Sequence, residues 1–524
     1  MGSTISSKSW FRPARIIVIV VVVALAAAAA FTYWPRQATL TNNGSGGNLP
    51  QSDTWPTDNW QTASPESMGL DSGKLATILN TVKENKIPIH SWMVIRNGYV
   101  VLDAYFYPYD GTTLHDIASA TKSITTTLVG IAADKGYLSL DDTMVSFFPV
   151  RTIANLNEWK QQITVRDLAT MTSGLHCDDK GGEEWTQNEM RASDDWIQFV
   201  LDLEAIHEPG TVWAYCSPGS YMLSAILTQA TGMSALEFAQ QNLFGPLGIK
   251  DVYWPADSQG VTWGWGELAM YPRDMAKIGL LWLNMGEWDS QQIVSRGWVE
   301  DAITPFIRTD RGQDYGYGLW LNTGGDIFSY MGSGRNGQEI AVAPELGLVL
   351  VKTGGGYDPE VMDVYLLSAV GDLVNGMPEN SEGQTQLTGA QAAMLQAPAA
   401  EPIPTLPTIA QEISGKKFTI DGNDVFDGYL KLSFLDSGEA QLEFTVKGEI
   451  EPRISQVGLD GLYRTSLSGK PVLARGEWVD DQTFKIEYNE GPGLNLLFFM
   501  MKFEGNQLHL DITGVGSFSG TMEE

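Results

Sequence analysis

Residues 117–136 read IASATKSITTTLVGIAADKG, and this stretch decides the fold that we expect for most of the chain. The pattern predicts a helix from Ser119 to Gly136 whose apolar face is formed by Ile124, Leu128, Ile131 and Ala132. Residues three positions apart are neighbours on a helix, so we expect the side chain of Lys122 beside that of Ser119. A partly desolvated lysine can lose its proton and accept that of a serine hydroxyl, which is otherwise a poor nucleophile. A Ser and a Lys at this spacing also occur by chance, so the surrounding sequence has to decide.

A second group of residues lies further along the chain. Tyr215-Cys-Ser217 follows a Pro-Gly turn sequence and precedes a helical pattern from Ser220 to Thr231. Together with Ser119-Ala-Thr-Lys122, it resembles the serine β-lactamase and penicillin-binding protein superfamily. The resemblance is closest to the esterase and amidase branch, which includes class C-like β-lactamases, carboxylesterases and aminohexanoate-dimer hydrolases. It extends over 64–374, where further segments occur in the family's order: Leu168-Ala-Thr-Met-Thr-Ser-Gly174, Thr231-Gly232, Phe244-Gly-Pro-Leu-Gly248, Arg273-Asp274 and Gly337-Gln338.

The resemblance implies a mixed α/β fold of the β-lactamase/transpeptidase type, with an antiparallel sheet flanked by helices and a helical subdomain. It also implies an acyl-enzyme mechanism in which Ser119 attacks a carbonyl, Lys122 takes part in proton transfer and Tyr215 is the other acid-base group. A lysine ammonium beside a tyrosine favours the phenolate, which is compatible with that role. A core aromatic is the alternative for Tyr215. Ser217 stands where many relatives have asparagine, and it can donate one hydrogen bond to a substrate or to Lys122.

The family's third motif is a strand with Lys- or His-Thr-Gly, and the sequence offers two candidates. Lys352-Thr-Gly354 is the literal match, but the family pattern has a short turn, Gly-Gln and a further strand after the motif. We therefore assign the motif to Gly332-Ser333-Gly334, which is followed by Arg335-Asn-Gly337-Gln338. In this register the backbone N–H groups of Ser119 and Arg335 form an oxyanion hole, and Lys352 lies one strand too late. Because glycine replaces the cationic or imidazole side chain of relatives, we expect neutral substrates.

Cys177 and Cys216 are the only cysteines of the chain, and both lie next to segments of the candidate site. In an oxidising compartment they are candidates for a disulfide, with two buried thiols as the alternative. The segment His176-Cys-Asp-Asp179 also suggests a metal site. However, consecutive side chains diverge, and no second ligand pair with zinc-like spacing exists. We therefore expect neither a metal nor another cofactor.

The N-terminus predicts export. An uncharged run, 16–34, is long enough to span a bilayer as a helix, and it follows the basic residues Lys8, Arg12 and Arg15. Positive charge on that side keeps 1–15 in the cytoplasm and places the rest of the protein in the periplasm or outside the cell, anchored to the membrane. A cleaved signal peptide is the alternative, because Ala26–Ala30 offers a cleavage site, and the protein would then be secreted. A formal charge of −30 argues against a nucleic-acid partner.

Changes in composition divide the rest of the chain. Residues 35–59 are rich in Asn, Gly and Ser and predict a flexible linker, and 60–379 predicts one large mixed domain. Residues 380–413 turn polar and then rich in Pro and Ala, which is typical of a second linker. Residues 414–524 contain short alternating runs, such as Tyr429-Leu-Lys-Leu-Ser-Phe434, and predict a small all-β domain.

Three functions remain open at this point. The first is hydrolysis of a small carboxylic ester, amide or peptide-like substrate, and the second is a β-lactamase or D-Ala-D-Ala carboxypeptidase activity. The third belongs to another class, a membrane-tethered binding protein with an inactive hydrolase fold. The complete set of Ser119, Lys122 and Tyr215 favours an enzyme.

Overall fold

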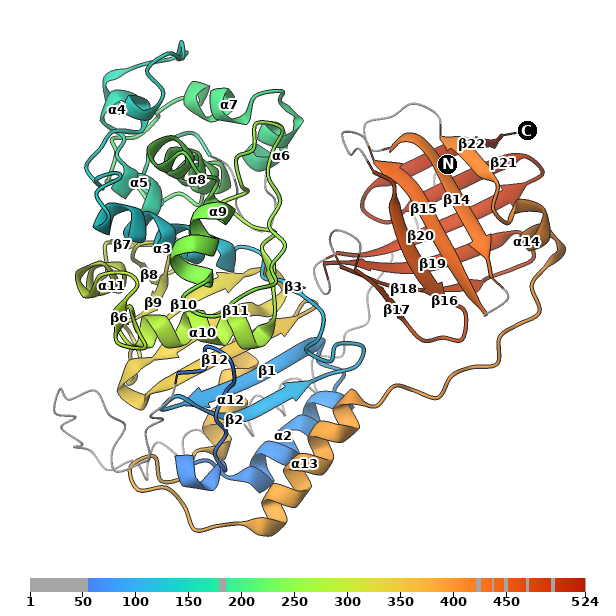
Figure 1. Ribbon diagram of the computed structural model, residues 1–524, viewed down its shortest axis with the longest axis horizontal. Coiled ribbons are helices and arrows are strands. Elements are labelled where there is room, and N and C mark those ends of the chain that lie inside the picture. Colours follow the sequence, from blue (N-terminus) through green and yellow to red (C-terminus); the bar gives the residue numbers. More distant parts are fainter. Residues whose placement is uncertain are drawn as a thin grey trace, which may run out of the picture.

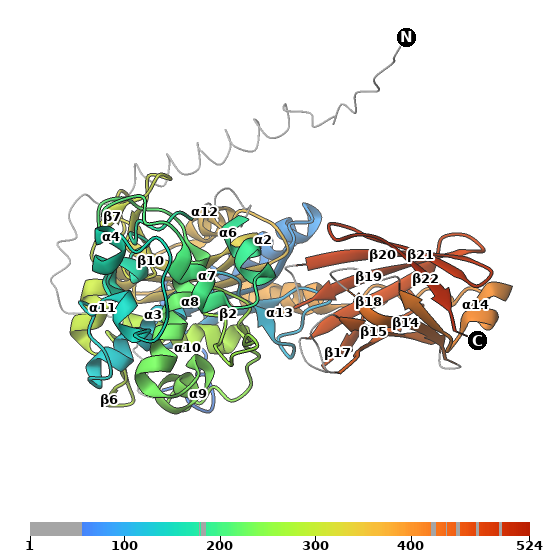
Figure 2. The ribbon, with the colours of Figure 1, turned by 90° about the horizontal axis from the view of Figure 1, so that it is seen from above.

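The computed structural model describes residues 55–177, 179, 185–420, 426–435, 438–446, 451–467, 471–491 and 495–523. Two folded units lie side by side, a larger mixed one and a smaller one made of strands (Figures 1 and 2). The predicted α/β architecture with an all-β C-terminal domain is confirmed. The predicted membrane span, 16–34, lies outside the described residues. Within them, no helix combines the length and the apolar character needed to cross a bilayer.

An antiparallel eight-stranded sheet forms the centre of the larger unit, in the order β2-β1-β12-β11-β10-β9-β8-β7. Successive side chains alternate between the two faces, so Trp92 and Val94 of β1 pack on one side and Met93 and Ile95 on the other. Because both faces are covered, β1 is buried along its whole length. The strands are β1 (Ile89–Arg96), β2 (Tyr99–Tyr105), β7 (Ile307–Arg308), β8 (Asp314–Tyr315), β9 (Trp320–Asn322), β10 (Ser329–Gly334), β11 (Gln338–Ala343) and β12 (Leu348–Gly354).

Helices cover the two faces of this sheet and extend into a helical subdomain (Figure 1). One face packs against α2 (Ser72–Glu84), α12 (Glu360–Ala369) and α13 (Ser381–Leu395). The other face packs against α3 (Ala120–Asp134) and α10 (Pro272–Leu283). The other helices are α4 (Glu158–Gln162), α5 (Val165–Ala169), α6 (Trp185–Ala192), α7 (Trp196–Asp202), α8 (Ser217–Thr231), α9 (Ala235–Ala239) and α11 (Arg296–Ala302). Two short strand pairs complete this unit: β3 (His115–Asp116) with β4 (Ala269–Met270), and β5 (Glu287–Trp288) with β6 (Gln291–Gln292).

Helix α3 is buried on all sides, whereas the sequence pattern predicts a single apolar face. Every residue from 120 to 132 is buried, because the helix lies between α8 and β10. Its buried hydroxyls are satisfied by backbone carbonyls, as when Thr125 donates to Gly264 O over 2.8 Å. Ser119 stands at the N-cap of this central helix, where surrounding elements hold its position.

The C-terminal unit is a barrel of ten strands, in the order β16-β15-β14-β13-β22-β21-β20-β19-β18-β17. Neighbours in this order are antiparallel, and a pairing of Gly458 with Arg475 joins β16 to β18 and closes the barrel. Buried aromatic rings fill its interior, including Phe418, Phe484, Tyr488, Phe499 and Phe503. The strands are β13 (Lys417–Ile420), β14 (Phe426–Phe434), β15 (Glu439–Val446), β16 (Arg453–Gly458), β17 (Arg464–Ser466), β18 (Val472–Trp478), β19 (Thr483–Glu490), β20 (Asn495–Glu504), β21 (Gln507–Ile512) and β22 (Gly516–Met522).

Part of the segment that we predict as a second linker, 380–413, is helical in the structure. Helix α13 packs along α2, and Gly383 permits the close approach, since a Cβ atom there would lie 2.4 Å from Ser72 Oγ. The amide of Gln384 donates to the buried carboxylate of Glu66 over 3.1 Å. The small residues that indicate a linker therefore serve a close helix pair. A short helix, α14 (Thr408–Ile413), precedes the barrel.

Replacing Leu387 by alanine should lower the free energy of unfolding of the larger unit by about 2–5 kcal/mol, because it leaves a cavity between α13 and α2. The matched control is Leu395→Ala at the end of the same helix, since Leu395 is 41% exposed and Leu387 only 5%. Urea denaturation followed by tryptophan fluorescence measures both. Equal midpoints for the two variants would mean that α13 does not belong to the core of this unit.

Candidate active site

The turn before α3 is held in an unusual backbone conformation. Ala118 has φ +50°, a left-handed value that costs a non-glycine residue conformational energy. Its N–H donates to Asp116 Oδ1 over 2.8 Å, and its carbonyl accepts from the hydroxyl of Thr121 over 2.6 Å. These bonds stabilise the strained turn and direct Ser119 at the start of the helix. Such strain is often found at functional sites.

Lys122 lies beside Ser119, as the i, i+3 spacing predicts. Its Nζ is 3.0 Å from Ser119 Oγ and also donates to Trp265 O over 2.8 Å. The side chain is almost completely buried, with Lys122 only 3% exposed. The carbonyl of Trp265 therefore holds the Lys122 nitrogen against the serine hydroxyl, a contribution that has no signature in the sequence.

Tyr215 joins this pair from the loop before α8. Lys122 Nζ lies 4.8 Å from the centre of its ring. The ring stacks at 25° on that of Trp320, with 6.4 Å between centroids, and Trp213 is at 6.2 Å. Tyr215 is half-buried and packs against this aromatic cluster. The structure brings Ser119, Lys122 and Tyr215 together.

Ser217 occupies a more enclosed position than expected. It is fully buried as the first residue of α8, and its backbone N–H donates to Asp179 Oδ2 over 3.0 Å. Its hydroxyl has no hydrogen-bond partner within the described part of the chain. A hydrogen bond from Ser217 to substrate stays a prediction, and none to Lys122 is present among the described residues.

Asp179 is a residue whose role the sequence does not indicate. Its buried carboxylate accepts the N–H of Ser217 at the start of α8 and, over 3.2 Å, the N–H of Gln187 in the first turn of α6. The sequence suggested Asp179 only as a metal ligand. No group of His, Cys, Asp and Glu side chains able to hold a metal occurs among the described residues.

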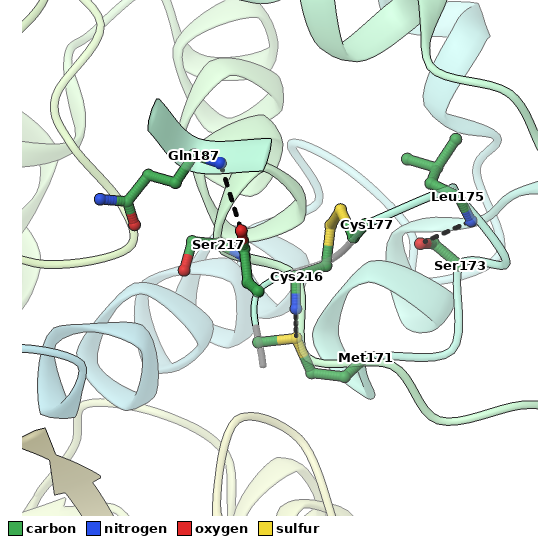
Figure 3. The surroundings of a disulfide bond; sticks show 8 residues. Met171, Ser173, Leu175, Cys177, Gln187, Cys216 and Ser217 are labelled. Carbon is green, nitrogen blue, oxygen red and sulfur yellow. Dashed lines mark hydrogen bonds between the residues drawn. A yellow bond between two sulfur atoms is a disulfide. The ribbon is translucent and has the colours of Figure 1, made fainter. Parts of the chain in front are cut away.

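A disulfide joins Cys177 to Cys216, as predicted (Figure 3). Both residues are buried, and the N–H of Cys216 points to the sulfur of Met171 at 3.4 Å. The bond ties the loop that carries Asp179 to the residue next to Tyr215. The disulfide at Cys216 and the Asp179 carboxylate at Ser217 thus both hold the turn that follows Tyr215.

The end of β10 passes directly beside the start of α3. A Cβ atom at Gly334 would lie 2.5 Å from Ile117 O and 3.0 Å from the backbone nitrogen of Ser119. Gly332 faces Ser123, whose Oγ would lie 2.8 Å from an added Cβ. The segment Gly332-Ser333-Gly334 therefore borders the candidate nucleophile, in agreement with the register assigned from sequence.

The turn that follows, Arg335–Gly337, is held by the buried side chain of Gln338. Its Nε2 donates to Arg335 O over 3.2 Å and to Gly354 O over 2.6 Å, and its Oε1 accepts the N–H of Gly354 over 3.1 Å. This amide joins the ends of two strands across the sheet. The backbone of Arg335 is thereby fixed next to Ser119.

Lys352 lies away from this site. It pairs in register with Trp92, on the sheet face covered by α12. Its buried Nζ lies 2.6 Å from Glu339 Oε1 and 2.7 Å from Asp363 Oδ1. Burial opposes its charge, but Glu339 and Asp363 outweigh that effect and raise the pKa of Lys352. The literal Lys352-Thr-Gly354 is therefore part of a structural ion cluster.

Two buried histidines lie behind the strained turn. His90 Nδ1 and His115 Nε2 are 2.9 Å apart, and His115 Nδ1 lies 2.9 Å from Asp116 O. Burial lowers the pKa of His90, as does the neighbouring His115, and burial lowers the pKa of His115 to about 4. Both rings are therefore neutral near pH 7, and they connect β1 with the segment that leads to Ser119.

Comparison with known proteins agrees with this geometry. The family described as "Beta-lactamase" matches residues 76–365, more than half of the chain. The chain belongs to this family. It is a serine hydrolase of the kind that includes esterases and amidases, which confirms the resemblance of the sequence motifs.

Individual members of the family are only distantly similar. The 6-aminohexanoate-dimer hydrolase of Paenarthrobacter ureafaciens is 24% identical over 289 residues, 52% of this chain and 73% of that protein. The beta-lactamase of Escherichia coli (strain K12) is 26% identical over 201 residues, 36% of this chain and 51% of that protein. A solved family VIII carboxylesterase has a TM-score of 0.46 and 16% identity, and the match covers 64% of this chain and 99% of that structure.

Replacing Lys352 by methionine should lower the free energy of unfolding by about 3–5 kcal/mol, because Glu339 is left buried without its cation. The double variant Lys352→Met/Glu339→Leu should recover most of this loss. Chemical denaturation measures stability, and kcat/KM for an ester measures the site. Unchanged stability with lost activity would show that Lys352 belongs to the reaction.

Reduction of the disulfide should lower the melting temperature and reduce the rate, because the bond joins two residues 39 positions apart in the chain, next to Tyr215. Chain entropy alone gives a stabilisation of about 4 kcal/mol for a loop of this length. Differential scanning fluorimetry with and without a phosphine reductant measures the effect, and a Cys177→Ser/Cys216→Ser variant should not respond. Two thiols that titrate in the unfolded, unreduced protein would contradict the cross-link.

Proposed function

We propose that this protein hydrolyses carboxylic esters or amides through an acyl-enzyme on Ser119. The observation that carries the proposal is the 3.0 Å contact between Lys122 Nζ and Ser119 Oγ, with the ring of Tyr215 at 4.8 Å from the same nitrogen. A serine hydroxyl reacts only when a neighbouring base takes its proton. Lys122 contacts the hydroxyl directly, and Tyr215 lies next to Lys122.

The reaction proceeds in two halves. Ser119 Oγ attacks the carbonyl carbon while its proton passes to the Lys122 and Tyr215 pair, and the tetrahedral intermediate collapses as the leaving group takes up that proton. A water molecule then attacks the acyl carbon and gives a proton to the same pair. Cleavage of the ester bond returns that proton to Ser119 Oγ and releases the carboxylic acid.

Backbone N–H groups stabilise the negative charge on the carbonyl oxygen. Ser119 N–H is one donor, and no acceptor for it is found among the described residues. Arg335 N–H is the second donor, held in place by the amide of Gln338. The negative charge develops on the carbonyl oxygen only during the reaction. Two preorganised donors therefore stabilise the transition state more than the bound substrate, and this lowers the activation barrier.

Neutral substrates fit this site better than anionic ones. Gly332-Ser333-Gly334 contains no cationic side chain. Lys352 forms ion pairs with Glu339 and Asp363 on the other face of the sheet. Ser333 can donate one neutral hydrogen bond. The second candidate, a β-lactamase or D-Ala-D-Ala carboxypeptidase, would need a partner for the carboxylate of its substrate.

The proposal places the enzyme outside the cytoplasm, anchored by residues 16–34. The uncharged run behind three basic residues supports this location, and so does the disulfide, since such bonds persist in oxidising compartments. Cleavage after the alanine run would instead give a secreted form. Extraction of membranes with alkaline carbonate separates the two, because an integral protein stays in the pellet.

Replacing Ser119 by alanine should abolish hydrolysis and labelling by a fluorophosphonate probe, with an unchanged fold. Lys122→Ala and Tyr215→Phe should each lose several orders of magnitude in kcat/KM. Because the three groups act as one unit, double variants should be little worse than Ser119→Ala. Stopped and steady-state assays on a nitrophenyl ester give these values. Retained labelling in Ser119→Ala would sink the assignment, and strictly additive losses would contradict the unit.

Neutral esters should be turned over with kcat/KM at least about tenfold above penicillins or cephalosporins, the factor that corresponds to a lost charge-assisted hydrogen bond of about 1.4 kcal/mol. Nitrophenyl butyrate and nitrocefin provide the comparison under one set of conditions. The Lys352→Met/Glu339→Leu variant is the control, since it removes the literal motif without changing the assigned site. Efficient nitrocefin hydrolysis that this variant loses would favour the β-lactamase.

A further inference from the structure

A cavity of about 930 Å³ lies between the two folded units. Its walls come from the ends of α2 and α13, the start of β1, the segment after β2 and the barrel. Two hydrogen bonds cross between the units at this cavity. Tyr463 N donates to Tyr107 Oη over 3.3 Å, and Asn489 Nδ2 donates to Tyr109 Oη over 2.6 Å. Its volume is that of typical small-molecule sites, which often form at domain interfaces.

The charge of this cavity is opposite to that of the protein. The chain has 63 acidic and 33 basic residues, yet among the described residues two lysines and no Asp or Glu line the cavity. Lys83 Nζ donates to Ala393 O over 2.9 Å. Neither Lys83 nor Lys86 has an ion-pair partner in the described part of the chain. Two exposed lysines without a carboxylate partner among the described residues, at the rim of an open cavity, favour an anionic ligand.

The remaining walls are largely apolar or aromatic, and they include Phe106, Tyr109 and Met394. The ring of Tyr109 stacks on His90, with 3.8 Å between centroids. From this combination we propose that the cavity binds a small amphipathic molecule, with an apolar body against these walls and an anionic group at Lys83 and Lys86, and that its occupancy affects the hydrolase site.

The cavity lies at the same end of the sheet as Ser119. Ile89 at the start of β1 pairs with Gly354 at the end of β12, and Gly334 at the end of β10 pairs with Gln338. Three strand spacings separate β1 from β10, about 14 Å. An extended molecule can therefore reach from one to the other across the sheet end.

A second connection passes through the histidine pair. His90 lines the cavity and lies 2.9 Å from His115, which precedes Asp116. Asp116 in turn holds the strained Ala118 before Ser119. A ligand that contacts His90 therefore touches the support of the candidate nucleophile. Two kinds of molecule have this chemistry: a long substrate, whose distal part would occupy the cavity, and a separate effector.

Binding is tested with anilinonaphthalene sulfonate, an anionic aromatic probe, and with N-phenylnaphthylamine, its neutral analogue. The full chain and its Ser119→Ala variant should bind both, so this measurement does not depend on the proposed hydrolysis. In Lys83→Gln/Lys86→Gln, the sulfonate should bind at least about tenfold more weakly, while the neutral probe is unaffected. Lys74→Gln, an exposed lysine on α2 outside the cavity, should behave as wild type.

A filling variant, Ala397→Trp, should weaken binding of both probes, because Ala397 lines the cavity. Unchanged sulfonate affinity in the double lysine variant would overturn the anionic specificity. Equal weakening in Lys74→Gln would show a general charge effect and also overturn it. Full binding of both probes by Ala397→Trp would place them elsewhere and refute the cavity as the site.

Kinetics of nitrophenyl ester hydrolysis with the sulfonate present distinguish a long substrate from a separate effector. If the cavity holds the distal part of the substrate, esters with a longer acyl chain should compete with the probe. The probe then raises KM for these esters and leaves kcat unchanged. A changed kcat for short and long esters alike indicates a separate effector. Hydrolysis that is indifferent to saturating probe, at every chain length, would overturn the link to the hydrolase site.

Discussion

The close approach between the end of β10 and the start of α3 is the constraint on which the site depends. Any side chain at Gly334 would overlap Ile117 O, so only glycine lets the strand pass beside the Ser119 amide. Both partners of this contact are held from behind. Asp116 supports the left-handed Ala118 on one side, and Gln338 ties the Arg335 turn to Gly354 on the other. The geometry for two converging N–H groups thus arises from backbone packing rather than from reactive side chains.

The sequence predicts what is local and misses what is brought together by folding. The spacing of Ser119 and Lys122 on one helix is a local property, and the disulfide follows from having only two cysteines near one site. The carbonyl of Trp265 cannot be anticipated in this way, because every residue has a carbonyl. Asp179 was noticed for its neighbours, His176 and Cys177, yet its partners are backbone N–H groups of α6 and α8. Hydrogen bonds to the backbone leave little trace in a single sequence.

Small residues misled the sequence analysis at α13 for a related reason. Serine, glycine and alanine are typical of linkers, but they also allow two helices to pack at short distance. Gly383 and Ala390 do this against α2, and Leu387 supplies the apolar contact. Composition alone does not distinguish a linker from a closely packed helix pair. The hydrogen bond from Gln384 to the buried Glu66 identifies α13 as part of a packed helix pair. Helix α3 shows the opposite problem: its threonines indicate a polar face, but in the structure their hydroxyls are bonded to carbonyls and buried.

The two glycine-containing tripeptides show why position in the sheet outranks a literal motif. Lys352-Thr-Gly354 has the expected letters, but its lysine points to the face covered by α12, where Glu339 and Asp363 neutralise it. Gly332-Ser-Gly334 lacks the lysine and yet borders Ser119. A buried ion cluster requires its partners, so Lys352 is unable to serve a substrate without leaving two carboxylates uncompensated. Gly332-Ser-Gly334 therefore supplies no cation beside Ser119. Lys83 and Lys86, which have no ion-pair partner in the described part of the chain, line the cavity, whose β1 wall lies three strands from β10. In the arrangement that we propose, an anionic group binds at the cavity and the carbonyl reacts at Ser119. This separation favours either one long substrate that spans both places or a substrate together with a separate effector.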